Sequence, residues 1–197
     1  MIEIDQNMAY EERCSRLREA IISGVGDARF PLREAVELVV ASGIWSEYAA
    51  VLVFRLDDED ESCILFDSYV VEKDADGGWA CPQSSSGSSL PIAMLDRAEH
   101  GLPDWQGAEM VSIGSAFRAI DGLQVASISL AFSQAVTSAT IRHGQDVLLL
   151  TVPDSGFVTM PVRVLSRNDF FWVETTDPQS NSIERMRFPI TSDSLIL

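Results

Sequence analysis

The chain has 197 residues with 30 acids and 14 bases, which gives a formal net charge of −16 at pH 7. A hydrophobic content of 46% is ordinary for a globular protein, and the length allows one large domain or two small ones. The negative field disfavours nucleic acid and anionic membranes as partners, and it favours a protein partner with a basic surface.

The acidity is concentrated in the first half of the chain. Residues 1–108 carry 21 acids and 8 bases, a net charge of −13, whereas residues 109–197 carry 9 acids and 6 bases, a net charge of −3. The first half is therefore the electrostatic half, and a binding surface led by charge is expected there.

The cysteines and the N-terminus predict a cytoplasmic protein. Met1–Asp5 lacks the basic segment and apolar core of a secretory signal, and no apolar run is long enough to span a membrane. Cys14, Cys63 and Cys81 are odd in number and widely spaced, so we expect reduced thiols. A Cys63–Cys81 bridge is the alternative, because both residues flank the same predicted group of strands.

Two helices are predicted near the N-terminus. The first covers Met8 to Ser23 and ends at Gly24, and the second begins at Pro31 and ends at Gly43. Each is indicated by apolar residues at helical spacing: Tyr10, Cys14, Leu17 and Ile21 in the first, and Leu32, Ala35, Val36, Val39 and Val40 in the second. The short link between them predicts an antiparallel helical hairpin.

Residues 49–81 are typical of an antiparallel meander. Apolar, β-branched and aromatic runs at 49–56, 63–71 and 79–81 are separated by loops rich in acids and glycine. The first two runs are apolar on both faces and need cover on both, and the helical hairpin is expected to cover one face. The other face is either covered by the second half of the chain or used for an interface.

A linker is predicted between the two halves. Ser84–Ser89 contains five serines and a glycine, and Pro91–His100 is expected to form a short helix. The predicted domains are therefore 1–82, a Ser-rich linker with a short helix at 83–108, and 109–197.

The region from 109 onward is expected to form an antiparallel β-sandwich. Seven short strands are separated by turn signals, and residues 125–132 alternate strictly between two faces. This arrangement resembles the architecture of immunoglobulin-like modules, although no cysteine lies beyond Cys81 to form their disulfide. The predicted fold class is α+β, with an N-terminal helical hairpin packed on a β-meander followed by a C-terminal β-sandwich.

Acidic loop residues and one tryptophan are the candidate partner-binding residues: Asp57, Asp58, Glu59, Asp60, Glu61, Asp74, Asp76 and Trp105. The plainest interpretation of the acids is a pair of solvated turns, and docking of a basic partner is the functional one. An EF-hand loop starting at Asp57 would need glycine and glutamate where Ser62 and Ser68 stand, so a calcium site is not predicted. Trp105 lies in a polar loop, where it either folds back onto the domain or anchors an interface.

No catalytic or metal-binding motif is present. The two histidines, His100 and His143, are expected to be exposed beside glycines, and Ser155 is interpreted as a turn residue. There is no G-x-S-x-G, no C-x-x-C and no glycine-rich phosphate loop. The sequence therefore predicts no catalytic residues, no metal and no cofactor.

These observations favour a non-catalytic protein-binding module. The most concrete version is an acidic inhibitor or immunity-type protein whose negative half covers a basic site on its partner. One alternative is a structural or assembly subunit that self-associates through its β-rich half. A second is a ligand carrier or enzyme with a pocket between helices and sheet, near Trp45, Tyr48 or Tyr69.

Overall fold

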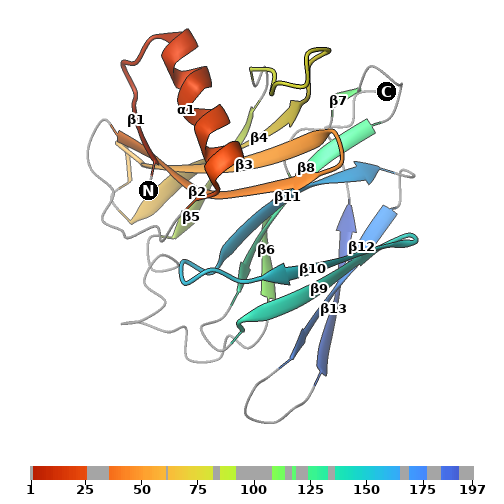
Figure 1. Cartoon of the computed structure of the whole chain (residues 1–197). Helices are drawn as coiled ribbons and strands as arrows, with labels where there is room; N and C mark the ends of the chain where they lie inside the picture. Colours follow the sequence, from red (N-terminus) through yellow and green to blue (C-terminus); the bar gives the residue numbers. More distant parts are fainter. Residues whose placement is uncertain are drawn as a thin grey trace.

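The computed structural model describes residues 2–25, 36–60, 62–81, 85–91, 108–113, 117–118, 124–132, 136–164, 169–176 and 183–190. Within these ranges the chain is predominantly β, with one helix, so the predicted α+β fold with a helical hairpin is wrong (Figure 1). The elements are β1 (Ile2–Asp5), α1 (Tyr10–Ser23), β2 (Val36–Trp45), β3 (Tyr48–Leu56), β4 (Cys63–Glu72), β5 (Ser85–Pro91), β6 (Ala108–Ile113), β7 (Phe117–Arg118), β8 (Gln124–Phe132), β9 (Ser138–His143), β10 (Asp146–Thr151), β11 (Phe157–Val164), β12 (Asp169–Thr176) and β13 (Ile183–Ile190).

These strands form three antiparallel sheets. The N-terminal sheet has the order β1-β2-β3-β4-β5, the middle sheet β11-β8-β6 with β7 also paired to β8, and the C-terminal sheet β10-β9-β12-β13. Helix α1 packs on the outer face of the N-terminal sheet, and the middle sheet packs between the other two. The described chain is therefore layered as one helix and three sheets.

The second predicted helix is instead strand β2. Its apolar run is buried on both sides, because Val39 packs under α1 while Leu38 and Val40 pack toward the middle sheet. A short apolar run covered on both faces has no polar face to distinguish a strand from a helix, and its β-branched valines favour the strand. The start of the predicted helix, residues 31–35, lies outside the described residues.

Strand β5 lies where the sequence predicted the start of a flexible linker. Ser85–Pro91 pairs antiparallel with β4, from Tyr69↔Ser85 to Cys63↔Pro91. Backbone hydrogen bonds to an adjacent strand order this polar run, which has few apolar side chains to signal it. The predicted helix at 91–100 falls almost entirely outside the described residues, and the division into 1–82, 83–108 and 109–197 stays a prediction.

The N-terminal and middle sheets share a mixed core. Phe54 of β3 packs edge to face on Phe157 of β11, with ring centroids 4.9 Å apart. At the same interface, the Ser68 hydroxyl lies 2.6 Å from that of Ser127, and the Ser129 hydroxyl lies 2.9 Å from that of Thr159. All four hydroxyl residues are buried, so each polar group gains a partner that replaces water.

Strand β2 approaches β11 very closely at Gly43. A Cβ atom placed on Gly43 would lie 2.1 Å from the carbonyl oxygen of Thr159, so only glycine fits at this crossing. The glycine that was predicted to end a helix therefore allows two sheets to come into contact.

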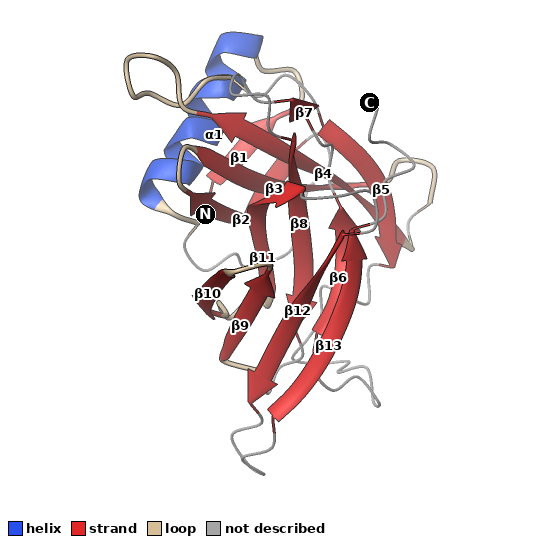
Figure 2. Cartoon of the chain, turned by 90° about the vertical axis from the view of Figure 1, so that its right-hand side faces the viewer, coloured by secondary structure: helices blue, strands red, loops and turns tan. Residues whose placement is uncertain are grey.

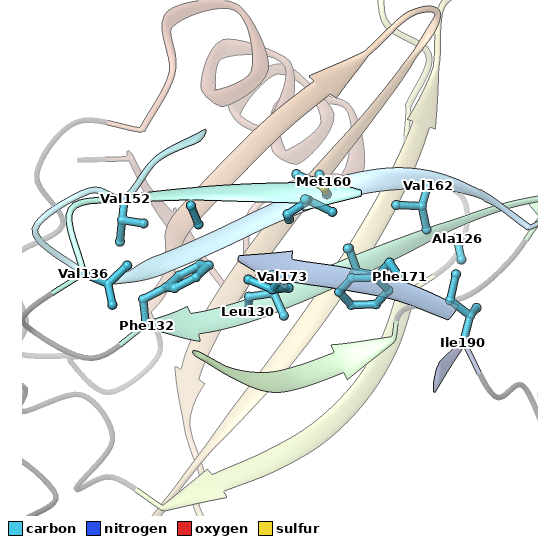
Figure 3. Packing of buried hydrophobic residues seen from close by; sticks show 13 residues of the cluster. Ala126, Leu130, Phe132, Val136, Val152, Met160, Val162, Phe171, Val173 and Ile190 are labelled. Atoms are coloured by element: carbon cyan, nitrogen blue, oxygen red, sulfur yellow. The ribbon is translucent and has the colours of Figure 1, made fainter. Parts of the chain in front are cut away.

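The middle and C-terminal sheets enclose the largest apolar cluster (Figure 3). The even-numbered side chains of β8, including Leu130 and Phe132, point toward Phe171 and Val173 of β12. The odd-numbered side chains face the N-terminal sheet. The alternation predicted for residues 125–132 is confirmed, although both faces are buried.

A disulfide joins Cys14 of α1 to Cys81, with Cα atoms 5.2 Å apart, while Cys63 is free. The prediction of reduced cysteines is therefore wrong for this pair, and the alternative bridge named the wrong partner for Cys81. Residues 67 apart in sequence are brought together because α1 packs beside the end of the meander.

The described part of the chain contains no helix with the length and apolar composition that a membrane span needs.

Candidate interaction surface

The predicted acidic residues lie at opposite ends of the N-terminal sheet. Asp57–Asp60 follow β3 at one end of the β3–β4 hairpin, and Asp74 and Asp76 follow β4 at the other end. The ten residues of β4 separate the two groups by about 30 Å. They therefore form two patches, while Glu61 and Trp105 lie outside the described residues.

Several of these carboxylates hold their own turns. Asp57 accepts the backbone N–H of Glu59 at 3.0 Å, and Asp74 accepts that of Gly78 at 2.7 Å. Asp60 accepts the hydroxyl of Ser62 at 2.6 Å and its N–H at 2.9 Å, and these bonds lower the pKa of the Asp60 carboxyl. Turn formation explains these three residues. Asp58, Glu59 and Asp76 are exposed, and their carboxylates are the ones that a partner could contact without breaking these turn bonds.

A second surface, which the sequence did not predict, covers the outer side of the C-terminal sheet. We call it the arginine–aromatic face, and its members are Arg142, Phe170, Trp172, Glu174, Arg185 and Arg187. The strand registers and the alternation of side chains place all six on the side away from the apolar core. Figure 2 looks toward this sheet, with β12 and β13 in front.

The arginines of this face stack on its aromatic rings. The guanidinium carbon of Arg185 lies 4.7 Å from the Trp172 ring centroid, and that of Arg187 lies 3.9 Å from the Phe170 centroid. Phe170 and Trp172 meet edge to face with centroids 6.1 Å apart. Contact with the rings restrains the guanidinium groups, so they lose less conformational freedom when they bind a partner.

Glu174 positions two of the arginines. Its Oε2 accepts Arg142 Nε at 2.9 Å, and its Oε1 accepts Arg185 Nε at 3.0 Å. Both bonds use Nε, so they leave the terminal amino groups of each guanidinium for other acceptors. With three arginines and one glutamate the face carries a net charge of +2, in a chain whose net charge is −16.

Beside this face lies the edge strand β10, whose outward side chains are Val147, Leu149 and Thr151. Val147 is 57% exposed and Leu149 is 76% exposed, while Leu148 and Leu150 pack partly against the core. A groove of about 240 Å³, with both polar and apolar residues in its lining, lies beside this strand and is bordered by Leu148, Leu150 and Ile44 of β2. Exposed apolar side chains concentrated on one strand are typical of an interaction site.

The sequence held a weak signal for this surface. Arg185 and Arg187 are two residues apart in sequence, as Phe170 and Trp172 are, so each pair lies on one face of its strand. If the two strands pair, the four side chains can share a face. The pairing Trp172↔Arg187, which only the tertiary structure shows, places them on the same face. Trp172 is half-buried on the outer side of β12, a position that fits an interface.

A buried ionic cluster fixes α1 to the sheet. Arg13 Nη1 lies 2.5 Å from Glu37 Oε2, and Arg13 Nη2 donates to the Tyr69 hydroxyl at 2.7 Å. Burial raises the pKa of the Tyr69 phenol, and the positive charge of Arg13 opposes part of that rise. Burial by itself would lower the pKa of Arg13, but Tyr69 and Glu37 outweigh it and the pKa is raised. These contacts join helix α1 to strands β2 and β4, so the role of the cluster is structural.

His143 is buried, contrary to the exposed turn position predicted for it. Its Nε2 lies 2.8 Å from Asp169 Oδ2, while Asp169 Oδ1 accepts the N–H of Phe170. The adjoining cavity, lined also by Trp45 and Arg163, has a volume of about 30 Å³, which is room for a water molecule. Within the described ranges, none of the hydrogen bonds identified joins His143 to a hydroxyl or thiol nucleophile. His100 falls outside these ranges.

Ser155 has a structural role in the described part of the chain. Ser155 lies in a turn, and its hydroxyl accepts the N–H of Phe157 at 3.4 Å, as its interpretation as a turn residue requires. No group of three or more His, Cys, Asp or Glu side chains in the described ranges could hold a metal ion.

No family model and no curated protein matches this sequence.

Proposed function

We propose that this chain is a non-catalytic protein-binding module whose arginine–aromatic face docks an acidic partner. The observation that carries the proposal is the stacking of Arg185 on Trp172 and of Arg187 on Phe170 across one open sheet face. Arginine and large aromatic residues are the side chains most enriched at the energetic centres of protein interfaces.

The chemistry of the face selects for carboxylates. A guanidinium can bind a carboxylate through two parallel hydrogen bonds, and a neighbouring aromatic ring supplies apolar area. Half of the six arginines beyond residue 108 gather here, so the local field is opposite in sign to that of the whole chain. A partner that presents Asp or Glu beside an apolar side chain fits this surface best.

The proposal can be tested with a fluorescein-labelled oligoglutamate peptide and a neutral oligoglutamine peptide of the same length. Fluorescence anisotropy is expected to report binding of the acidic peptide alone, weakening as salt rises. The double variant Arg185→Glu/Arg187→Glu should weaken binding by roughly tenfold or more.

The matched control is Arg16→Glu/Arg18→Glu on helix α1. Both pairs are exposed and both double variants change the net charge equally, so general repulsion of the peptide affects them alike. Equal loss of binding in the two double variants would show that total charge, and not the face, is responsible.

The acidic tip offers a second candidate function, the inhibitor or immunity-type role. It is favoured by Asp58 and Glu59, which are exposed at the end of the β3–β4 hairpin and suit a basic partner. Binding of a labelled oligolysine peptide that is lost in Asp58→Asn/Glu59→Gln, but kept in Glu11→Gln/Glu12→Gln on α1, would support this role.

The cytoplasmic location stays a prediction, and the disulfide is an argument against it. Disulfides that link distant segments are rare in reducing compartments and common in oxidising ones. Intact-mass measurement of the protein from its native cells, with and without thiol alkylation, tests this directly. An alkylated Cys14 and Cys81 would support the cytoplasmic location.

A further inference from the structure

Strand β10 presents an open edge on the C-terminal sheet. It pairs with β9 from Asp146↔His143 to Thr151↔Ser138, and no described strand pairs with its other side. The hairpin turn Gly144–Gln145 closes at the Asp146↔His143 pair, and Val152 N–H bonds Thr137 O at 2.9 Å in the same register. Even-numbered residues therefore bond to β9, and the N–H and C=O groups of Val147, Leu149 and Thr151 point outward.

This edge lacks the features that protect the other edges. Residues 147–151 include no charged residue, no proline and no glycine. The one charged residue of β10 is Asp146, at the turn, whereas every other described edge strand carries at least one such residue within the strand: Glu3 in β1, Gly87 in β5, Glu109 in β6, Arg118 in β7, Pro161 and Arg163 in β11, and Glu184, Arg185, Arg187 and Pro189 in β13. An uncharged edge with exposed leucine is a template for pairing with another strand.

We propose that β10 pairs antiparallel with β10 of a second copy of this chain, about a two-fold axis at Leu149. The outward backbone groups belong to odd-numbered residues, so they must face odd-numbered residues of the copy. Centring on Leu149 pairs Leu149 with itself and Val147 with Thr151 of the copy, and uses the whole uncharged stretch. This register forms six hydrogen bonds between the copies, two for each of the three outward pairs.

The side chains also match in this register. Leu149 meets its own copy and Val147 meets threonine on the outer side, while Leu148 meets Leu150 on the inner side. The inner leucines of the copy would lie along the groove beside Ile44, which is itself 50% exposed. Asp146 faces Val152 of the copy, so no like charges oppose each other.

Charge also favours a second copy at this place. The half of the chain that contains β10 carries a net charge of −3, against −13 in the other half, so repulsion between two copies is smallest here. The two-fold axis stands perpendicular to the joined sheet, which turns both arginine–aromatic faces to the same side. A dimer would then hold an acidic partner at two points, and its avidity would exceed that of one face.

Sedimentation velocity on the full chain tests the dimer. We expect a reversible, concentration-dependent species of twice the 21.6 kDa chain mass. Leu149→Lys should leave a monomer, because its charge would meet the same charge across the axis. Tyr10→Lys is the matched control, since Tyr10 is 62% exposed and lies at the start of α1, and this variant should dimerise as the wild type does.

Cysteine cross-linking tests the register in a Cys63→Ser background. Leu149→Cys should form an interchain disulfide, because paired Cα atoms lie about 5.5 Å apart across such a register. Val147→Cys should not, because the two copies of residue 147 are offset by four residues, about 14 Å along the strand. The double variant Val147→Cys/Thr151→Cys should cross-link again.

A wild-type protein that stays monomeric, a dimer that survives Leu149→Lys, or efficient cross-linking through Val147→Cys would each overturn the proposal. These outcomes are separate from those of the proposed function. Leu149→Lys leaves the arginines in place and should keep oligoglutamate binding to each chain, whereas Arg185→Glu/Arg187→Glu should keep the dimer.

Discussion

Replacing Gly43 with alanine should destabilise the protein by separating two sheets. The new Cβ would lie 2.1 Å from the carbonyl oxygen of Thr159, where carbon and oxygen normally stay about 3.3 Å apart. The strands must therefore move apart by about 1 Å. Neither atom belongs to a flexible side chain, so no rotamer change can relieve the contact.

The cost follows from what that gap removes. A gap of 0.5–1 Å forfeits roughly a quarter to a half of each van der Waals contact across it, and here it runs between β2 and β11 beside the Phe54–Phe157 pair. We expect a loss of about 3 kcal/mol in the free energy of unfolding, at the upper end of overpacking costs. For a chain of this length that corresponds to a melting temperature about 6–12 °C lower.

Urea denaturation followed by tryptophan fluorescence measures the change. The control is Gly78→Ala, whose Cβ would meet the carboxylate of Asp74 at 2.9 Å in an exposed turn. That side chain can move, so the control should cost about 1 kcal/mol or less. If Gly43→Ala unfolds within about 0.5 kcal/mol of the wild type, or if both variants lose equally, the close crossing of β2 and β11 is wrong.

Three further predictions concern the core and the disulfide. Replacing Cys14 and Cys81 with serine should lower the free energy of unfolding by about 2–4 kcal/mol, because the bridge restrains residues 67 apart in the unfolded chain; identical denaturation curves would contradict this. Phe157→Ala should cost about 3–5 kcal/mol by opening a cavity beside Phe54, and a loss below about 1 kcal/mol would mean that the sheets do not pack there. Burial raises the pKa of Tyr69 above its ordinary value of 10.0, so the folded protein keeps a proton that the unfolded chain releases. Stability from this source is complete below about pH 10 and falls as pH rises through the raised pKa, and Tyr69→Phe should reduce that fall when unfolding is measured against pH. An equally steep alkaline loss in the variant would rule out Tyr69 as its source.

The sequence predicted most elements that have one clear periodicity. Helix α1 and strands β3, β4 and β8 lie within two residues of the bounds predicted for them, because an amphipathic helix or an alternating strand carries its own pattern of burial. The acidic turns were located as well. Their local hydrogen bonds depend on neighbours in sequence, which is why Asp57 and Asp74 could be interpreted as turn residues without knowledge of the fold.

The tertiary structure decided whatever depends on what covers an element. Strand β2 looked helical because it is apolar on both faces, and only the sheets and helix around it make it a strand. The serines of β5 became a strand through backbone bonds to β4, and His143 became buried through Asp169. The arginine–aromatic face and the open edge of β10 are likewise products of register between segments far apart in sequence, since periodicity reports burial but not the identity of the neighbour.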